Sequence, residues 1–130
     1  MTYSRPGAGT HLVNSTGAIL THGQPVSIGG ISGIAIKQKA TKWSDPFTAA
    51  TQIQTGEKFW CITKGIVQVD SAPLTTPAKG DPVYIVVATN VLTKTVGSNV
   101  KFGRIVELPG DGRSVPAGKA RIDLDMKDSF

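Results

Sequence analysis

The sequence GDPVYIVVATNVLTKTVGSNVKFGRIV occupies residues 80–106 and contains the clearest succession of turn and strand signals in the chain. Its opening Gly-Asp pair favours a turn, and Pro82 suits the first position of a strand. Residues 83–87 are all β-branched or aromatic, which is typical of a strand. Two further apolar runs, at residues 91–93 and 101–106, are separated by a segment that contains Gly, Ser and Asn. We therefore predict two or three antiparallel strands in this region.

A similar opening occurs earlier in the chain. The sequence GQPVSI at residues 23–28 matches GDPVYI at residues 80–85 at four of six positions. An apolar run with interspersed glycine, residues 31–36, follows the first copy as residues 101–106 follow the second. The similarity predicts a repeated structural unit. The alternative is a pair of unrelated turns that share a Gly-x-Pro signature.

Short apolar runs bounded by turn residues continue through the rest of the chain. Gly29 and Gly30 between two such runs favour a two-residue hairpin of the primed type. Residues 57–63 and 66–69 fit two further strands, and residues 119–126 alternate charged and apolar side chains with a period of two. Only 39% of the residues are apolar, with 15 Gly and 8 Pro. We predict an all-β fold, a compact β-barrel or a β-tulip or sandwich of short antiparallel strands.

The chain of 130 residues is expected to form one folded domain, residues 21–130, preceded by an N-terminal arm, residues 1–20. The net charge is +5, and the first carboxylate in the sequence is Asp45. The preceding 44 residues carry four unopposed cations. Such a charge distribution favours an anionic partner, either nucleic acid or an acidic protein surface. The four cations are Arg5, Lys37, Lys39 and Lys42.

The sequence KQKATKWSDPF at residues 37–47 is the best candidate for an exposed contact segment. It combines three lysines with Trp43 and Phe47 and ends at a proline turn. Aromatic residues among cations suit stacking on single-stranded nucleic acid, and they equally suit a protein interface anchored by tryptophan. A solvated loop in which Trp43 is tucked against the domain is the third interpretation.

Several classes of chemistry have no candidate residues. Cys61 is the only cysteine, so an intrachain disulfide is excluded, and a buried, inert thiol is expected. His11 and His22 have no nearby carboxylate and are expected to be solvated loop residues. We find no catalytic motif and predict a protein that is not an enzyme and needs no cofactor or metal. No secretion signal and no apolar run of membrane-spanning length is visible, so we expect synthesis in a cytoplasm and no membrane partner.

The order and spacing of these motifs resemble the small head-decoration, or capsid-cement, proteins of tailed bacteriophages, which have a compact β-barrel or β-tulip core and an N-terminal arm. The resemblance covers most of residues 22–126 and is weakest in the arm and in residues 37–54. The similar residues are Ser27 to Ala35, Thr55 to Glu57, Gly65 to Val67, Ala78 to Tyr84, Phe102 to Ile105 and Ala120 to Leu124.

The resemblance implies a structural protein of the virion that assembles as a homotrimer on the outer surface of the head, binds after shell expansion and ties neighbouring major capsid subunits together. The arm would then bridge capsomers. The residues expected to contact the capsid are Arg5, Lys37, Lys39, Lys42, Trp43 and Phe47. Nucleic acid is not the expected partner. The alternative is a basic OB-like β-barrel that binds single-stranded nucleic acid through Trp43, Trp60 and Tyr84.

Overall fold

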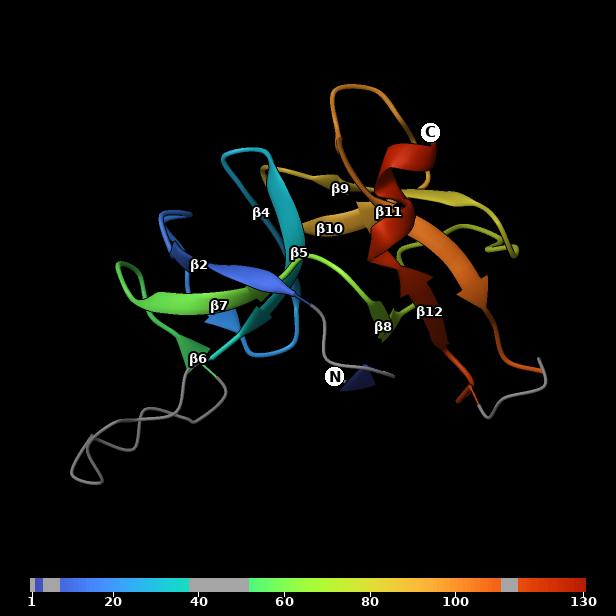
Figure 1. The fold of residues 1–130 in the computed structure, drawn as a ribbon, viewed down its shortest axis with the longest axis horizontal. Coiled ribbons are helices and arrows are strands. Elements are labelled where there is room, and N and C mark those ends of the chain that lie inside the picture. The colour runs from blue at the N-terminus through green and yellow to red at the C-terminus, as the bar shows by residue number, and fades with distance from the viewer. Residues whose placement is uncertain (1, 4–7, 38–51, 111–114) are drawn as a thin grey trace.

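The computed structural model describes residues 2–3, 8–37, 52–110 and 115–130 (Figure 1). Within these residues the chain forms strands and one short 3-10 helix, which confirms the predicted all-β class. The elements are β1 (Thr2–Tyr3), β2 (Gly9–Val13), β3 (Leu20–Thr21), β4 (Pro25–Ile28), β5 (Ile31–Ile36), β6 (Gln52–Ile53), β7 (Lys58–Ile62), β8 (Ile66–Asp70), β9 (Pro82–Val86), β10 (Val91–Thr93), β11 (Val100–Glu107), β12 (Lys119–Asp123) and the helix η1 (Leu124–Ser129).

The described strands form three antiparallel sheets. The largest has the order β1-β8-β12-β11-β9-β10, the second has the order β2-β7-β5-β4, and β3 pairs with β6. β4 and β5 contact β9 and β11, so the second sheet lies against the first. None of the three sheets closes into a barrel in the part of the chain that the structure describes. Of the predicted architectures, the sandwich or tulip form therefore agrees with the structure.

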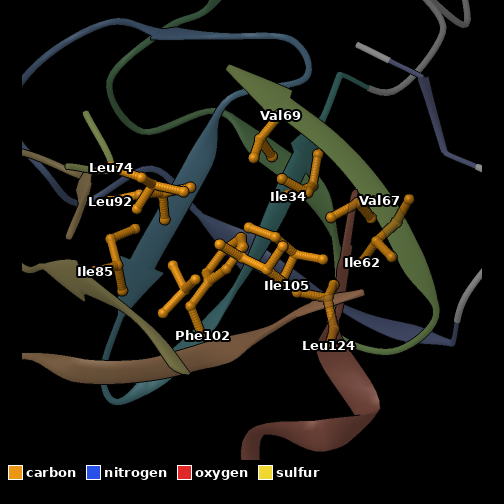
Figure 2. Close-up of a cluster of buried hydrophobic side chains, with 12 residues drawn as sticks. Ile34, Ile62, Val67, Val69, Leu74, Ile85, Leu92, Phe102, Ile105 and Leu124 are labelled. Atoms are coloured by element: carbon orange, nitrogen blue, oxygen red, sulfur yellow. The ribbon is translucent and has the colours of Figure 1, made fainter. Parts of the chain in front are cut away.

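The main hydrophobic core lies between the two larger sheets. Ile34 and Ile62 reach it from the second sheet, and Ile85 and Phe102 reach it from the first (Figure 2). A smaller cluster, which includes Val26 and Phe59, fills the other face of the second sheet. Apolar burial of this kind is the main favourable contribution to folding, so each sheet depends on its partner for stability.

Three turns with the same hydrogen bonds precede three of the strands. Residues 21–24, 54–57 and 78–81 each have glycine in the third position, and they lead directly into β4, β7 and β9. We call them the first, second and third capped turns. In each, the amide of the fourth residue donates to the carbonyl of the first, at 3.0–3.1 Å. The glycines need positive φ, which a type II turn requires at this position, and their φ values are 90° at Gly23, 85° at Gly56 and 86° at Gly80.

A side chain completes each capped turn. The fourth residue is Gln, Glu or Asp, and its side-chain oxygen accepts a hydrogen bond from the amide of the first residue. The turns that open residues 23–28 and 80–85 therefore have the same structure, and the second capped turn is a further example that the sequence comparison did not find. In the second capped turn the residue that follows the turn is Lys58, whereas proline follows the first and third turns and made them recognisable in the sequence. The cap distances are 2.7 Å from Thr21 N to Gln24 Oε1, 3.0 Å from Gln54 N to Glu57 Oε1 and 2.8 Å from Ala78 N to Asp81 Oδ2.

The cap of the third turn predicts a pH dependence of stability. The Lys94 ammonium, which lies 2.9 Å from the Asp81 carboxylate, is the main reason that the pKa of Asp81 falls below its ordinary value of 3.8. The unfolded chain therefore binds this proton at higher pH than the folded chain does. The contribution of Asp81 to stability is present above pH 3.8 and is lost as the pH falls through the lower, folded-state pKa.

Replacing Asp81 by Asn is expected to lower the urea midpoint at pH 7 and to lower it less at pH 3. The amide oxygen can still cap the turn, but it cannot pair with Lys94. Urea unfolding of both proteins at the two pH values measures the effect. An equal difference at pH 7 and pH 3 would show that the charge of Asp81 contributes nothing.

The tight hairpin and the last strand test two further predictions. Gly29 and Gly30 both have positive φ, 60° and 82°, and they join paired strands β4 and β5, which confirms the primed hairpin.

The strand predicted for residues 119–126 is wrong beyond Asp123. The Asp123 side chain accepts a hydrogen bond from the Asp125 amide and begins η1, so the alternation of apolar residues ends there.

The described parts of the N-terminal region pair with the rest of the domain. β1 pairs with β8, and β2 pairs with β7 along its whole length. Gly9 lies so close to β7 that a Cβ atom there would be 2.1 Å from the Cys61 carbonyl oxygen, and Leu20 is buried. We therefore confine the proposed arm to the residues that precede Ala8.

Candidate functional site

Only one residue of the predicted contact set can be placed in the fold. Arg5, Lys39, Lys42, Trp43 and Phe47 lie outside the described residues. Lys37 is described and follows the last residue of β5. The structure therefore defines the two ends of the 38–51 segment, Lys37 and Gln52, and we call this pair its neck.

The backbone holds both ends of the neck. On one side, β6 pairs with β3 in the register Leu20 with Ile53 and Thr21 with Gln52. On the other side, the Lys37 amide donates to Nδ1 of His22 at 3.0 Å. His22 is the second residue of the first capped turn, so a rigid turn positions the acceptor. His22 thus lies in a turn, as expected, but one of its ring nitrogens has a partner within the chain.

The Lys37 side chain crosses the neck. Its ammonium donates to the Gln52 carbonyl oxygen at 2.7 Å and forms an ion pair with Glu57 at 3.6 Å. Only 14% of the Lys37 side chain is exposed, although its charge suggested a surface contact. Glu57 is also the cap of the second capped turn. The charge of Lys37 is thus engaged within its own chain, and its contact with a partner stays a prediction.

The aromatic residues proposed for nucleic-acid stacking do not form one surface. Trp60 belongs to β7 and Tyr84 to β9, so the two lie in different sheets. Trp60 packs against the main core, with its ring 4.9 Å from that of His11 in an edge-to-face contact. Tyr84 is buried, and its ring contacts Phe130 edge-on. Trp60 and Tyr84 therefore cannot form one stacking surface for single-stranded nucleic acid, as the alternative interpretation required.

The described residues offer no obvious reaction chemistry. Within them, no group of three or more His, Cys, Asp or Glu could hold a metal ion. Cys61 is buried, as expected, and burial raises the pKa of its thiol to about 11 against the opposing effect of Lys127. The thiol is therefore protonated at neutral pH and a poor nucleophile. No helix in the described ranges is long and apolar enough to span a membrane.

Several apolar side chains are exposed on loops, at strand ends and in η1, where a binding partner could cover them. Seven of them are more than a third exposed, but scattered exposed apolar residues are common in monomeric proteins and do not by themselves mark an interface. Their positions spread over both large sheets. They are Val13, Ile19, Ile31, Val87, Val91, Val96 and Met126.

Comparison with known protein families decides the class of the protein. A family model described as phage cement protein matches residues 4–120, which is most of the chain. The chain belongs to the phage cement protein family. No curated protein and no solved structure matches it. The family assignment confirms the resemblance drawn from the order of the strand and turn motifs.

Membership in the cement family gives the chain a structural role in the virion, at the capsid. It is a family of structural, non-enzymatic proteins. The match ends at residue 120, within β12, so η1 lies beyond it. Arg104 holds η1 in place by donating hydrogen bonds to the side chain and carbonyl of Ser129.

Sequence reasoning did not find the residues that organise the neck. Gln52 contributes only its backbone carbonyl, which no sequence motif marks, and Glu57 lies outside the contact segment at residues 37–47. His22 has no partner within a few residues of it in the sequence. A usable signal was present in the pattern of glycine followed by Gln, Glu or Asp before a strand, which recurs at all three capped turns. The pattern identifies the caps, although it does not reveal the lysines that contact them.

Proposed function

We propose that the chain binds the outside of a phage capsid as a homotrimer and holds neighbouring major capsid subunits together. The observation that supports this most strongly is the match of residues 4–120 to the phage cement family. A cement protein repeats the same modest contact many times over a closed shell. Repetition stabilises the shell because each additional contact made by an already bound trimer is effectively intramolecular.

The proposed capsid contacts lie in the residues before Ala8 and in the 38–51 segment. Arg5, Lys39 and Lys42 would face acidic capsid surface, and Trp43 and Phe47 would supply apolar contacts. The absence of any Asp or Glu before Asp45 supports this choice, since the field of the first 44 residues is uniformly positive. Tryptophan is also a frequent anchor in protein interfaces.

Trimer formation would cover an edge of the described sheets with another subunit. β2 and β4 are the edges of the second sheet, and β1 and β10 are those of the first. Exposed edges invite uncontrolled pairing, and short edge strands or coverage by another subunit reduce that risk. β1 and β10 are short, whereas β2 is longer and is the edge that most needs cover.

The purified protein is expected to scatter light as a trimer of about 41 kDa, three times the mass of the 13.6 kDa chain. We expect no change in mass when a nonspecific oligonucleotide is added at low salt. A monomer would refute the trimer. Gain of the oligonucleotide's mass would instead support the nucleic-acid alternative, and that binding should fall steeply with added salt.

A further inference from the structure

Two of the three capped turns carry the same additional contact, which we call the lysine tie. In a lysine tie, one ammonium group contacts the cap carboxylate of the turn and also donates to the backbone carbonyl two residues before the turn. The capped turns begin at residues 54 and 78, so the carbonyls concerned are those of Gln52 and Thr76. Corresponding carboxylate and carbonyl groups are thus bridged at two places far apart in the sequence.

The tie at the third capped turn is formed by Lys94. Its ammonium lies 2.9 Å from Asp81 Oδ2 and donates to the Thr76 carbonyl at 3.0 Å and to the Thr75 carbonyl at 3.1 Å. Lys94 follows β10 directly. The tie therefore fastens the connection between β10 and β11 to the segment that leads into β9.

The tie at the second capped turn is formed by Lys37. Its ammonium lies 3.6 Å from Glu57 Oε2 and donates to the Gln52 carbonyl at 2.7 Å. Here the lysine and the carbonyl belong to the two residues that flank the 38–51 segment. The same contact that fastens a connection in the third turn closes the neck in the second.

The first capped turn shows what the carboxylate adds. Its cap, Gln24, accepts the turn amide as well as the carboxylates do, and its side-chain nitrogen donates to the Pro25 carbonyl at 3.2 Å. Capping therefore needs only an oxygen atom. The negative charge of Glu57 and Asp81 is not required for the turn, and in both cases it contacts a lysine.

We propose that Lys37 is a positioning residue that, with Glu57, holds the neck of the 38–51 segment, and that it does not itself contact the capsid. A neck that is already held in the free protein does not have to be ordered on binding, so that part of the entropic cost of attachment is removed. The part of this inference that concerns capsid attachment rests on the proposed function. The part that concerns the neck can be measured on the free protein.

The test uses Lys37→Met and Glu57→Gln, with Lys94→Met as a matched control. Glu57→Gln keeps an oxygen to cap the turn, as Gln24 does, but removes the charge that Lys37 contacts. Trypsin cleavage after Lys39 and Lys42 in the free protein reports on the neck. We expect cleavage there to be at least threefold faster in Lys37→Met and in Glu57→Gln than in the unaltered protein. The double variant should be cleaved at the same rate as either single variant, and Lys94→Met at the rate of the unaltered protein.

Attachment to capsids then separates positioning from contact. If Lys37 positions the segment, Lys37→Met and Glu57→Gln weaken attachment by similar factors, and the double variant is no weaker than either alone. Loss of attachment in Lys37→Met with normal attachment in Glu57→Gln would show a direct contact and overturn the proposal. Cleavage that neither variant accelerates would also overturn it. If even the unaltered protein fails to attach, the proposed function fails, while the cleavage rates still decide whether the neck is held as proposed.

Discussion

Truncation of Phe102 to alanine is expected to lower the free energy of unfolding by about 3–5 kcal/mol, the range typical of phenylalanine deletions in protein cores. Phe102 is completely buried and lies in the middle of the cluster between the two larger sheets (Figure 2). Its removal leaves a cavity that neighbours from both sheets can fill only in part. Because small domains are stable by about 5–15 kcal/mol in total, the loss is a large share of the whole.

Unfolding in urea, followed by circular dichroism, measures this effect. Val96→Ala is the control, because Val96 is an apolar residue that is 60% exposed. A substitution at such a surface position should change stability by no more than about 0.5 kcal/mol. A loss below about 1 kcal/mol in Phe102→Ala would mean that the two sheets do not share a core around this residue.

Deleting residues 2–7 is expected to weaken attachment to capsids at least tenfold while leaving the trimer and its stability nearly unchanged. Ala8 is a natural limit for the deletion, since its carbonyl accepts hydrogen bonds from the Thr63 and Lys64 amides. The following strand, β2, is paired with β7 and should be retained. Attachment should weaken because the deletion removes the proposed contacts between the arm and the capsid. The stability of the domain should change little, because the only described strand pairing that is removed is the short one between β1 and β8.

Sedimentation with capsids measures the loss, and light scattering checks that the deletion variant is still a trimer. A second variant, with residues 2–7 replaced by a Gly-Ser sequence of equal length, separates the chemistry of the arm from its length. Attachment of both variants at the level of the unaltered chain would show that the arm does not contact the capsid.

Much of the fold was predictable because its signals are local. β5 and β10 have the bounds that their apolar runs predicted, and β9 and β11 differ from prediction by one residue at each end. Glycine pairs and Gly-Asp turns mark strand ends through backbone conformation, which the sequence carries directly. The order of strands in the sheets was not predictable, because pairs such as β1 with β8 join residues that are distant in the chain.

The end of β12 shows how a local pattern can mislead. Leu124 and Met126 continue the apolar period of the strand, but in the structure Leu124 is fully buried whereas Met126 is 37% exposed. The difference arises because the Asp123 cap starts η1 and turns the chain. The capping bond to the Asp125 amide thus ends the strand although the alternating pattern continues to Met126.

The candidate site was predictable only in outline. Composition drew attention to the basic segment and to Lys37, since charge and aromatic content are visible in the sequence. The partners of Lys37 were not visible, because Glu57 and the Gln52 carbonyl come into contact with it only through the folding of β6 and the second capped turn. The charge of Lys37 therefore suggested a partner in another molecule, whereas the structure shows that its contacts are with Glu57 and Gln52 of the same chain.

The most direct test of the capsid-binding role is sedimentation of the purified protein with expanded phage shells that lack it. Our account predicts that the protein pellets with the shells, that the bound amount saturates, and that bound protein remains trimeric when crosslinked. It would be contradicted if folded protein stayed in the supernatant at every concentration tested, with expanded shells of the phage that encodes it.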